Sequence, residues 1–119
     1  MATITPAAPS IAGATAAFAA TAPAGDQIVY QGGDLLIEFD NGHASSITIS
    51  FAPTQTSGTI PGAGPATVPT RSIALAAGGK AAFRFKATDI RAYLNASKRL
   101  PITYTSGNAA LLIRSFSLK

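Results

Sequence analysis

Hydrophobic and polar residues alternate most clearly between positions 34 and 51. Large apolar side chains stand at every second position from Leu35 to Phe39, and a second alternating run extends from Ile47 to Phe51. A period of two places one set of side chains on each face of a β-strand. The pair Asn41-Gly42 lies between the runs and accepts positive φ angles, which favours chain reversal. The stretch is therefore predicted to form two strands joined as a β-hairpin or a tight β-corner.

The same pattern, with turn residues between the runs, predicts further short strands. They cover residues 27–31, 71–75, 80–86, 102–104 and 109–118. The last of these has large apolar residues on both faces, so it is expected to lie centrally in the fold or under another chain. A short helix is predicted from Asp89 to about Ala96, with Thr88 as its N-cap. About six to eight short strands at this spacing indicate an all-β fold, a single antiparallel β-sandwich or open barrel.

The first 25 residues differ in composition from the β-sandwich domain predicted for residues 26–119. They are almost wholly Ala, Thr, Pro, Gly and Ser, and their large side chains after Met1 are Ile4, Ile11 and Phe18. Ordering a chain costs about 1–2 kcal/mol per residue, more than so few apolar side chains recover. We expect an extended arm that is dispensable for folding and that anchors to a partner through these three side chains. A secretory signal is the weaker interpretation, because no Lys or Arg precedes the segment and prolines interrupt it.

Residues 52–69 form a second segment without alternation. They are rich in Pro and Gly and carry no charge. A loop of this length in a compact domain is usually functional or mobile. Two interpretations stay open: a flexible surface loop, or a loop that reaches a neighbouring molecule and loses little hydration on contact.

Charge is distributed unevenly along this 119-residue chain of net charge +4. All nine Lys and Arg follow residue 70, where Asp89 is the single acid, whereas the first 70 residues hold the other four acids. Such a split favours either complementary patches between subunits or simple solvation of the later strands. The basic residues expected to meet an acidic partner are Arg84, Lys86, Arg91 and Arg99. Nucleic-acid binding is the weaker alternative, because no stacking platform accompanies these residues on one strand pair.

No residue pattern predicts catalysis, a cofactor or a metal site. The chain has no Cys and no Trp, and its one histidine, His43, is expected to be a solvated loop residue. Asp34, Glu38 and Asp40 could supply oxygens to calcium, but no Asp-x-Asp-x-Asp loop surrounds them. Gly-x-Ser-x-Gly and phosphate-binding glycine motifs are absent. No run of 18 apolar residues predicts a membrane-spanning helix. The chain is therefore expected not to be an enzyme.

From Asp26 to Leu118, the order of motifs resembles that of small β-rich accessory proteins encoded among the head genes of tailed bacteriophages. In those proteins a Thr- and Ala-rich arm precedes an Asp, a short strand and a Gly-containing turn, here Asp26, residues 28–30 and Gly32-Gly33. The motifs that follow are a strand ending in Asn-Gly, an Ile-Thr-hydrophobic strand, a Pro-containing loop, an aromatic-rich segment and a hydrophobic-Thr-Tyr strand. They correspond to residues 35–42, 44–51, 52–69, 83–85 and 102–104.

The resemblance implies a capsid decoration, or cement, protein that binds the outer shell of a virion and stabilises it by inter-subunit contacts. Its implied partners are the major capsid protein and further copies of itself, as a trimer or dimer at the capsid surface. A tail or fibre module is the alternative within the same class. A carbohydrate-binding β-sandwich is the alternative from another class, although the chain offers no Trp on which a sugar could stack.

Overall fold

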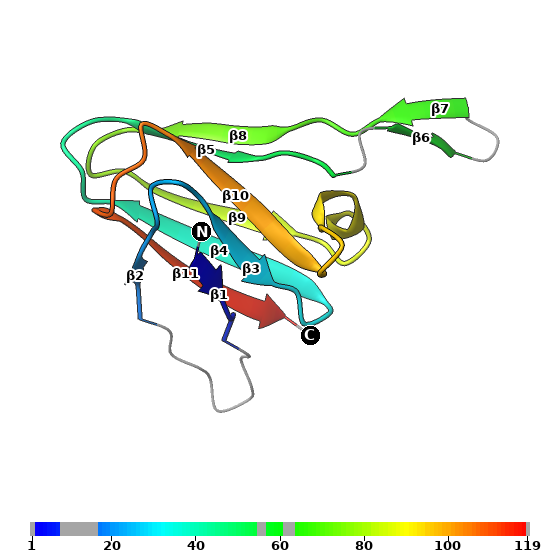
Figure 1. Ribbon diagram of the computed structural model, residues 1–119, viewed down its shortest axis with the longest axis horizontal. Helices are drawn as coiled ribbons and strands as arrows, with labels where there is room; N and C mark the ends of the chain where they lie inside the picture. The colour runs from blue at the N-terminus through cyan, green and yellow to red at the C-terminus, as the bar shows by residue number, and fades with distance from the viewer. Residues whose placement is uncertain (1, 8–16, 55–56, 61–63, 119) are drawn as a thin grey trace.

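Two β-sheets packed together form the body of the computed structural model, which describes residues 2–7, 17–54, 57–60 and 64–118 (Figure 1). The strand order is β1-β3-β10-β5-β8 in the five-stranded sheet and β2-β11-β4-β9 in the four-stranded sheet. A separate pair, β6-β7, projects from one end of the body. The all-β, sandwich-like fold predicted from the alternation is confirmed.

The strands predicted from the alternation all form, with bounds shifted by up to three residues. The five-stranded sheet contains β1 (Ala2–Ile4), β3 (Asp26–Val29), β10 (Arg99–Thr105), β5 (Ile47–Phe51) and β8 (Arg71–Leu75). The four-stranded sheet contains β2 (Ala19–Ala20), β11 (Leu111–Leu118), β4 (Asp34–Asn41) and β9 (Lys80–Phe85). Only β1 and β3 pair in parallel among these strands, whereas the other ladders are antiparallel.

The core lies between the sheets and is built from alternate residues of the central strands. In β4 the residues facing the core, from Leu35 to Phe39, are at most 1% exposed, and in β5 Ile47, Ile49 and Phe51 are fully buried. The ring centroid of Phe51 lies 5.0 Å from that of Phe85. Each such side chain contributes about 1.5–3 kcal/mol when fully buried, so the alternating pattern accounts for the sandwich.

The stretch with the clearest alternation connects the two sheets. β4 pairs with β11 and β9, whereas β5 pairs with β10 and β8. Of the two predicted connections, the β-corner is correct and the hairpin is wrong. The hairpin fails because each arm of the stretch belongs to a different sheet.

The reason predicted for the reversal at Asn41-Gly42 is also wrong, because neither residue has a positive φ. Asn41 is fully buried, and its Nδ2 donates hydrogen bonds to the backbone oxygens of Leu75 at 2.9 Å and Ala76 at 3.1 Å. Gly42 allows a close approach instead, since a Cβ there would lie 3.0 Å from the oxygen of Ala110. The corner is therefore held by a buried amide and a tight backbone contact.

The helix predicted for residues 89–96 is a single 3-10 turn, η1 (Ile90–Tyr93). Thr88 does not cap it; Asp89 stands at the N-cap position and makes no capping hydrogen bond with its side chain. The turn stops because Leu94 is extended and the Asn95 side chain closes the next turn, accepting hydrogen bonds from two later backbone N–H groups. The chain therefore enters β10 earlier than the helix prediction allowed.

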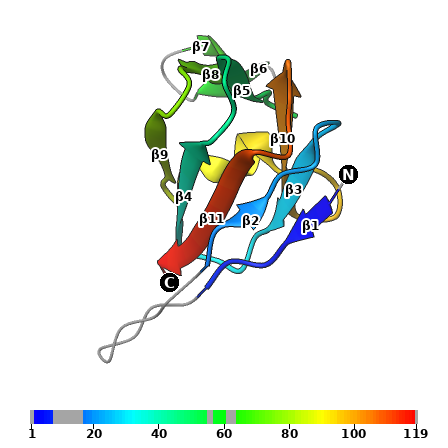
Figure 2. The ribbon, with the colours of Figure 1, turned by 90° about the vertical axis from the view of Figure 1, so that its left-hand side faces the viewer.

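The N-terminal arm lies along one lateral edge of the sandwich (Figure 2). β1 pairs with β3 in the five-stranded sheet, while Ala7 bridges to Phe116 and β2 pairs with Leu112 and Ile113 on β11 of the four-stranded sheet. The arm is thus extended where it is described, and it joins the edge strand of one sheet to that of the other. On the opposite side, β8 and β9 are the last strands of their sheets.

Candidate interaction surface

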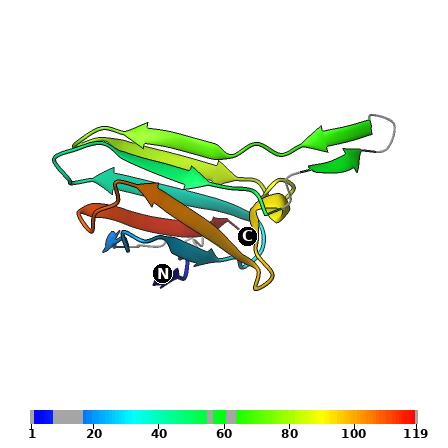
Figure 3. The same ribbon diagram turned by 45° about the horizontal axis from the view of Figure 1, so that its top comes forward.

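The segment at residues 52–69, predicted to be a loop, contains a two-stranded ribbon. β6 (Ser57–Ile60) pairs antiparallel with β7 (Gly64–Thr67), and the pair extends beyond the sandwich from the ends of β5 and β8 (Figures 1 and 3). No Lys, Arg, Asp or Glu occurs between residues 52 and 70. The ribbon therefore presents main-chain donors and acceptors without any charge.

A neck formed by residues 52–54 and 68–70 fixes the ribbon to the body through η1. The backbone N–H of Thr54 donates to the oxygen of Ala92 at 2.7 Å, and the Thr54 hydroxyl donates to the oxygen of Leu94 at 2.6 Å. On the other strand of the neck, the Pro69 oxygen accepts a 2.7 Å hydrogen bond from the hydroxyl of Tyr93. Tyr93 itself is 2% exposed. Both segments of the neck are therefore hydrogen-bonded to η1 or to Leu94, the residue that follows it.

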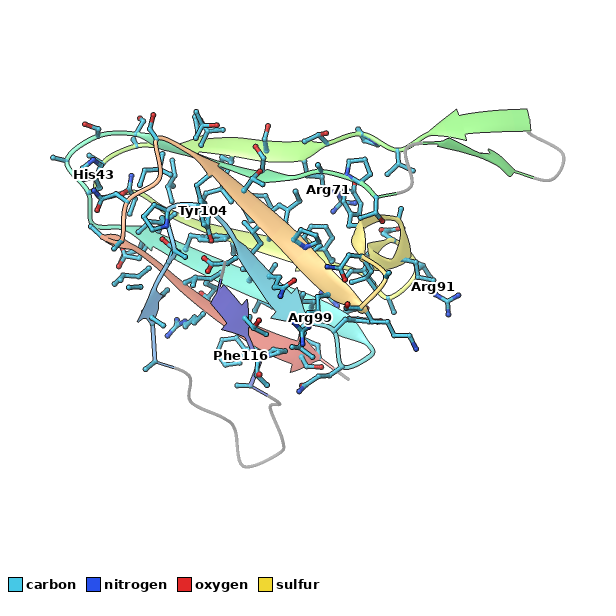
Figure 4. The ribbon with its side chains drawn as sticks, viewed as in Figure 1. His43, Arg71, Arg91, Arg99, Tyr104 and Phe116 are labelled. Atoms are coloured by element: carbon cyan, nitrogen blue, oxygen red, sulfur yellow. The ribbon has the colours of Figure 1, made fainter. Side chains whose placement is uncertain are left out.

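The predicted basic residues lie at the end of the sandwich from which the ribbon projects, and we call this the basic end. Arg84 and Lys86 stand where β9 finishes, Arg91 is on η1, and Arg99 begins β10 (Figure 4). Lys86 and Arg91 are exposed, whereas Arg99 is half-buried. The fold thus gathers four residues that are separated along the chain.

Arg84 already has an acidic partner within its own chain. Its Nη2 lies 2.7 Å from Oδ2 of Asp34, and the two side chains are 60% and 25% exposed. This hydrogen bond from Arg84, followed by one from the Ala87 N–H at 2.9 Å, holds the pKa of the Asp34 carboxyl below its usual value. Solvent screens an exposed pair of this kind, so it stabilises the fold little. Asp34 still neutralises part of the charge of Arg84, so Arg84 adds less free positive charge to the basic end than Lys86 or Arg91.

A hollow of about 430 Å³ opens at the basic end. Its lining residues are Tyr30, Arg91, Leu94, Asn95 and Lys98. In the part of the chain that the structure describes, neither Arg91 nor Lys98 forms an ion pair. The hollow combines two cationic groups with apolar walls, which suits a carboxylate carried on an aliphatic stem.

Two of the three predicted arm anchors contact the sandwich of their own chain. Ile4 is half-buried against the core. The ring centroid of Phe18 lies 4.2 Å from the guanidinium carbon of Arg114, whose Nε is 2.9 Å from Oε1 of Glu38. Ile11 lies outside the described residues. The arm is thus attached to the outer face of the four-stranded sheet by a cation–π contact.

The alternation did not predict a buried polar cluster where the arm enters β3. Asp26 is fully buried; its Oδ2 accepts hydrogen bonds from the Tyr104 hydroxyl at 2.7 Å and the Ala22 N–H at 3.2 Å. Burial, and then this bond to Asp26, raise the pKa of Tyr104 above its ordinary value. A single acid before a predicted strand gives no sign of such burial, because its partners are 4 and 78 residues away.

The remaining candidates for chemistry lie apart from one another. His43 is at the end opposite Arg91 (Figure 4), and its backbone N–H donates to Oδ1 of Asn41 at 3.0 Å. Asp34 and Glu38 both form ion pairs with arginines. Within residues 2–7, 17–54, 57–60 and 64–118, no group of three or more His, Cys, Asp or Glu side chains could hold a metal ion. No helix among these residues is long and apolar enough to cross a membrane.

No protein-family model, curated protein or solved structure matches this chain. The features that bear on function are therefore the order of the sequence motifs from Asp26 to Leu118 and the geometry of the fold. The structural features are a two-sheet sandwich, an uncharged ribbon on a hydrogen-bonded neck, and basic residues at the end of the sandwich from which the ribbon projects.

Proposed function

We propose that the chain is a non-enzymatic structural protein of a virion, a decoration protein that binds the outer surface of a capsid and stabilises it. The major capsid protein and further copies of the chain, as a dimer or trimer, are the proposed partners. The motif order from Asp26 to Leu118 supports the class of protein. The observation that carries the proposal is the ribbon, because it is held firmly at its neck and projects away from the core.

A projecting ribbon needs a neighbour for its own stability. An isolated pair of short strands is marginally stable in water. Each strand of the ribbon has four residues, which at a rise of about 3.3 Å per residue gives a length of roughly 13 Å. β6 contains no proline, so pairing of its free side with an exposed strand on a partner would satisfy the outer main-chain groups of that strand. We therefore assign the ribbon to the contact with the shell.

The basic end supplies the electrostatic part of the proposed contact. Lys86, Arg91 and Arg99 lie at the end of the sandwich from which the ribbon projects, so an acidic protein surface that seats the ribbon would face this end. A nucleic acid fits less well, because a ribbon that entered a groove would be expected to carry cations, and this one has none. Contacts between exposed charges are screened within roughly 10 Å at 0.1 M salt, so salt should weaken the binding without abolishing it.

The first part of the test is genomic position, because the proposal expects a major capsid gene beside the gene of this chain. The second part uses shells assembled from the capsid protein found there. The full chain should sediment with these shells. A variant in which residues 57–67 are replaced by Asn-Gly should lose at least about tenfold in affinity, which corresponds to about 1.4 kcal/mol. Thr54 and Pro69 remain in that variant, so the neck and the fold should persist, as judged by circular dichroism and the melting temperature.

Lys80→Ala is the matched control, because Lys80 is exposed at the opposite end of β9. It should bind shells as the unmodified chain does. Unchanged shell binding by the ribbon-deleted variant would remove the ribbon from the interface. Failure of the full chain to bind would overturn the proposed function.

A further inference from the structure

The edge strand β8 has one side without a partner. It pairs with β5 through residues 71–75 and is the last strand of the five-stranded sheet. Half of the main-chain N–H and C=O groups of an edge strand point away from the sheet and can pair with an added strand. In the described part of the chain, no strand lies against this outer side of β8.

Neighbouring edges carry features that discourage such pairing, and β8 does not. Prolines interrupt edges because they lack the N–H donor, and charged residues also protect them. β7 contains Pro65, and β9 carries Lys80 and Arg84. Between Ser72 and Ala74, β8 has neither a proline nor a charge. The centre of β8 is therefore open to pairing.

The one charged residue of β8 is turned toward the interior of the sandwich. The guanidinium carbon of Arg71 lies 5.0 Å from the ring centroid of Phe85 and 5.4 Å from that of Tyr93 (Figure 4). Both rings belong to buried residues. These cation–π contacts hold the positive charge away from the open side of the strand.

Ile73 at the centre of β8 is unusually exposed for a residue on the inner face of a sheet. It stands opposite Ile49, which is fully buried, so both side chains point toward the space between the sheets. Even so, 38% of Ile73 is exposed. Because β8 is the last strand, its inner face lacks a flanking strand that would cover this side chain.

We propose that β8 pairs antiparallel with β8 of a second copy of this chain, about a two-fold axis at Ile73. This register sets Ile73 against Ile73 of the second copy, Ser72 against Ala74, and Arg71 against Leu75. No like charges face each other, so the strand is its own complement, as a two-fold interface requires. The two five-stranded sheets become one continuous sheet, and the two exposed isoleucines cover each other.

The proposed dimer is weak in dilute solution. Five residues per copy form the shared ladder, whereas a standard interface involves about 20–30 residues on each side. A high local concentration, such as neighbouring binding positions on a larger assembly provide, would populate it. The inference names the surface through which the copies of the chain in the proposed function would meet, so it rests on that part of the proposed function. Loss of shell binding would leave the β8 contact intact, and failure to dimerise would leave the contact between the ribbon and the shell intact.

The dissociation constant of the dimer is measured by sedimentation equilibrium of the full chain. The chain concentration runs from about 1 µM to about 1 mM, which is the range of dissociation constants expected for a small interface. Ile73→Lys should raise that constant at least about tenfold, because like charges directly opposite each other destabilise a strand pair. Leu118→Lys is the matched control, since Leu118 is 37% exposed against 38% for Ile73. It should leave the dissociation constant unchanged.

A mixture of the Ile73→Lys and Ile73→Glu variants provides the second arm of the test. Each variant alone should dimerise at least about tenfold more weakly than the unmodified chain. The mixture should form a heterodimer, because opposite charges then meet at the two-fold axis. A chain that stays monomeric up to about 1 mM overturns the proposal. Dissociation by Leu118→Lys to the same extent, or failure of the mixture to associate, also overturns it.

Discussion

The two lateral edges of the sandwich differ in what lies beyond their last long strands. Beyond β3 and β11, the arm contributes β1, the bridge at Ala7 and β2, so we call this side the sealed edge. Beyond β8 and β9 the described chain adds no strand, and we call this side the open edge. The sealed edge is completed by a segment of mostly small residues. Closing a sheet edge therefore requires main-chain hydrogen bonds more than side-chain volume.

The edges also differ in the polar groups that they bury. At the sealed edge Asp26 is fully buried and Thr21 is 3% exposed, and the Thr21 hydroxyl lies 2.9 Å from the oxygen of Leu111. At the open edge the exposed feature is the apolar side chain of Ile73. A buried polar group that loses its hydrogen-bond partner destabilises the fold. Replacing an exposed isoleucine leaves no such group unpaired. Changes at the sealed edge should therefore affect folding, and changes at the open edge should affect association.

The largest effect is expected for Asp26→Ala. The Tyr104 hydroxyl and the Ala22 N–H, which belong to half-buried residues, would both lose their acceptor, and a polar group left unpaired in the interior costs about 1–3 kcal/mol. We expect the free energy of unfolding to fall by about 2–6 kcal/mol in urea denaturation, with no specific loss of β8 pairing while the chain is folded. Asp40→Ala is the control, since Asp40 is half-exposed, and it should change stability by less than about 0.5 kcal/mol. Equal effects of the two substitutions would contradict a special role for Asp26.

Removing residues 1–20 should convert the sealed edge into an open one. The loss includes the half-buried Ile4, and we expect the free energy of unfolding to fall by about 1–3 kcal/mol. The arm was predicted from composition to be dispensable for folding; its pairing with β3 and β11 now predicts this measurable loss. The exposed edge of β11 should also cause self-association that Ile73→Lys does not prevent. Unchanged stability and unchanged association of the truncated chain would show that the arm does not protect the edges of β3 and β11.

Stability should fall in alkaline solution because of Tyr104. The unfolded chain releases this phenolic proton at about pH 10, whereas the raised pKa keeps it bound in the folded chain. The contribution is therefore complete below about pH 10 and decreases by about 1.4 kcal/mol per pH unit above it. Urea denaturation of Tyr104→Phe should show a shallower decrease than the unmodified chain, whereas Tyr30→Phe should keep the slope. The same slope in all three proteins would rule out Tyr104 as its source.

Period-two alternation predicted the sandwich because the strands that build its core carry large apolar residues at every second position. It could not predict β1 and β2, because the small residues of the arm show no alternation and these strands pair mainly through the main chain. The ribbon was missed for a similar reason, since β7 contains a Gly and a Pro that normally indicate a loop. The buried positions of Asp26 and Asn41 depend on partners far away in the chain. Local pattern thus predicts burial of apolar side chains and misses polar groups whose burial depends on distant partners.

The position of the basic residues was predictable only in part. Composition indicated that the second half of the chain is basic. That Arg84, Lys86, Arg91 and Arg99 lie at one end of the sandwich could be seen only in the fold. The ion pair between Arg84 and Asp34 crosses from β9 to β4, which are 50 residues apart at this point. From the sequence, Arg84 was expected to meet an acidic partner and no partner was predicted for Asp34, because strand pairing over such separations is not visible in a local pattern.

Amide hydrogen exchange of the full chain at low and high concentration tests the difference between the two edges most directly. In dilute solution, the amides of β3 and β11 should exchange slowly, and those of β8 that point away from β5 should exchange fast. At about 1 mM, where a small interface forms, the β8 amides should slow down in the unmodified chain and stay fast in Ile73→Lys. Two results would contradict the proposed difference between the edges. One is slow exchange of the β8 amides at every concentration. The other is exchange of the β11 edge amides as fast as that of the β8 amides in dilute solution.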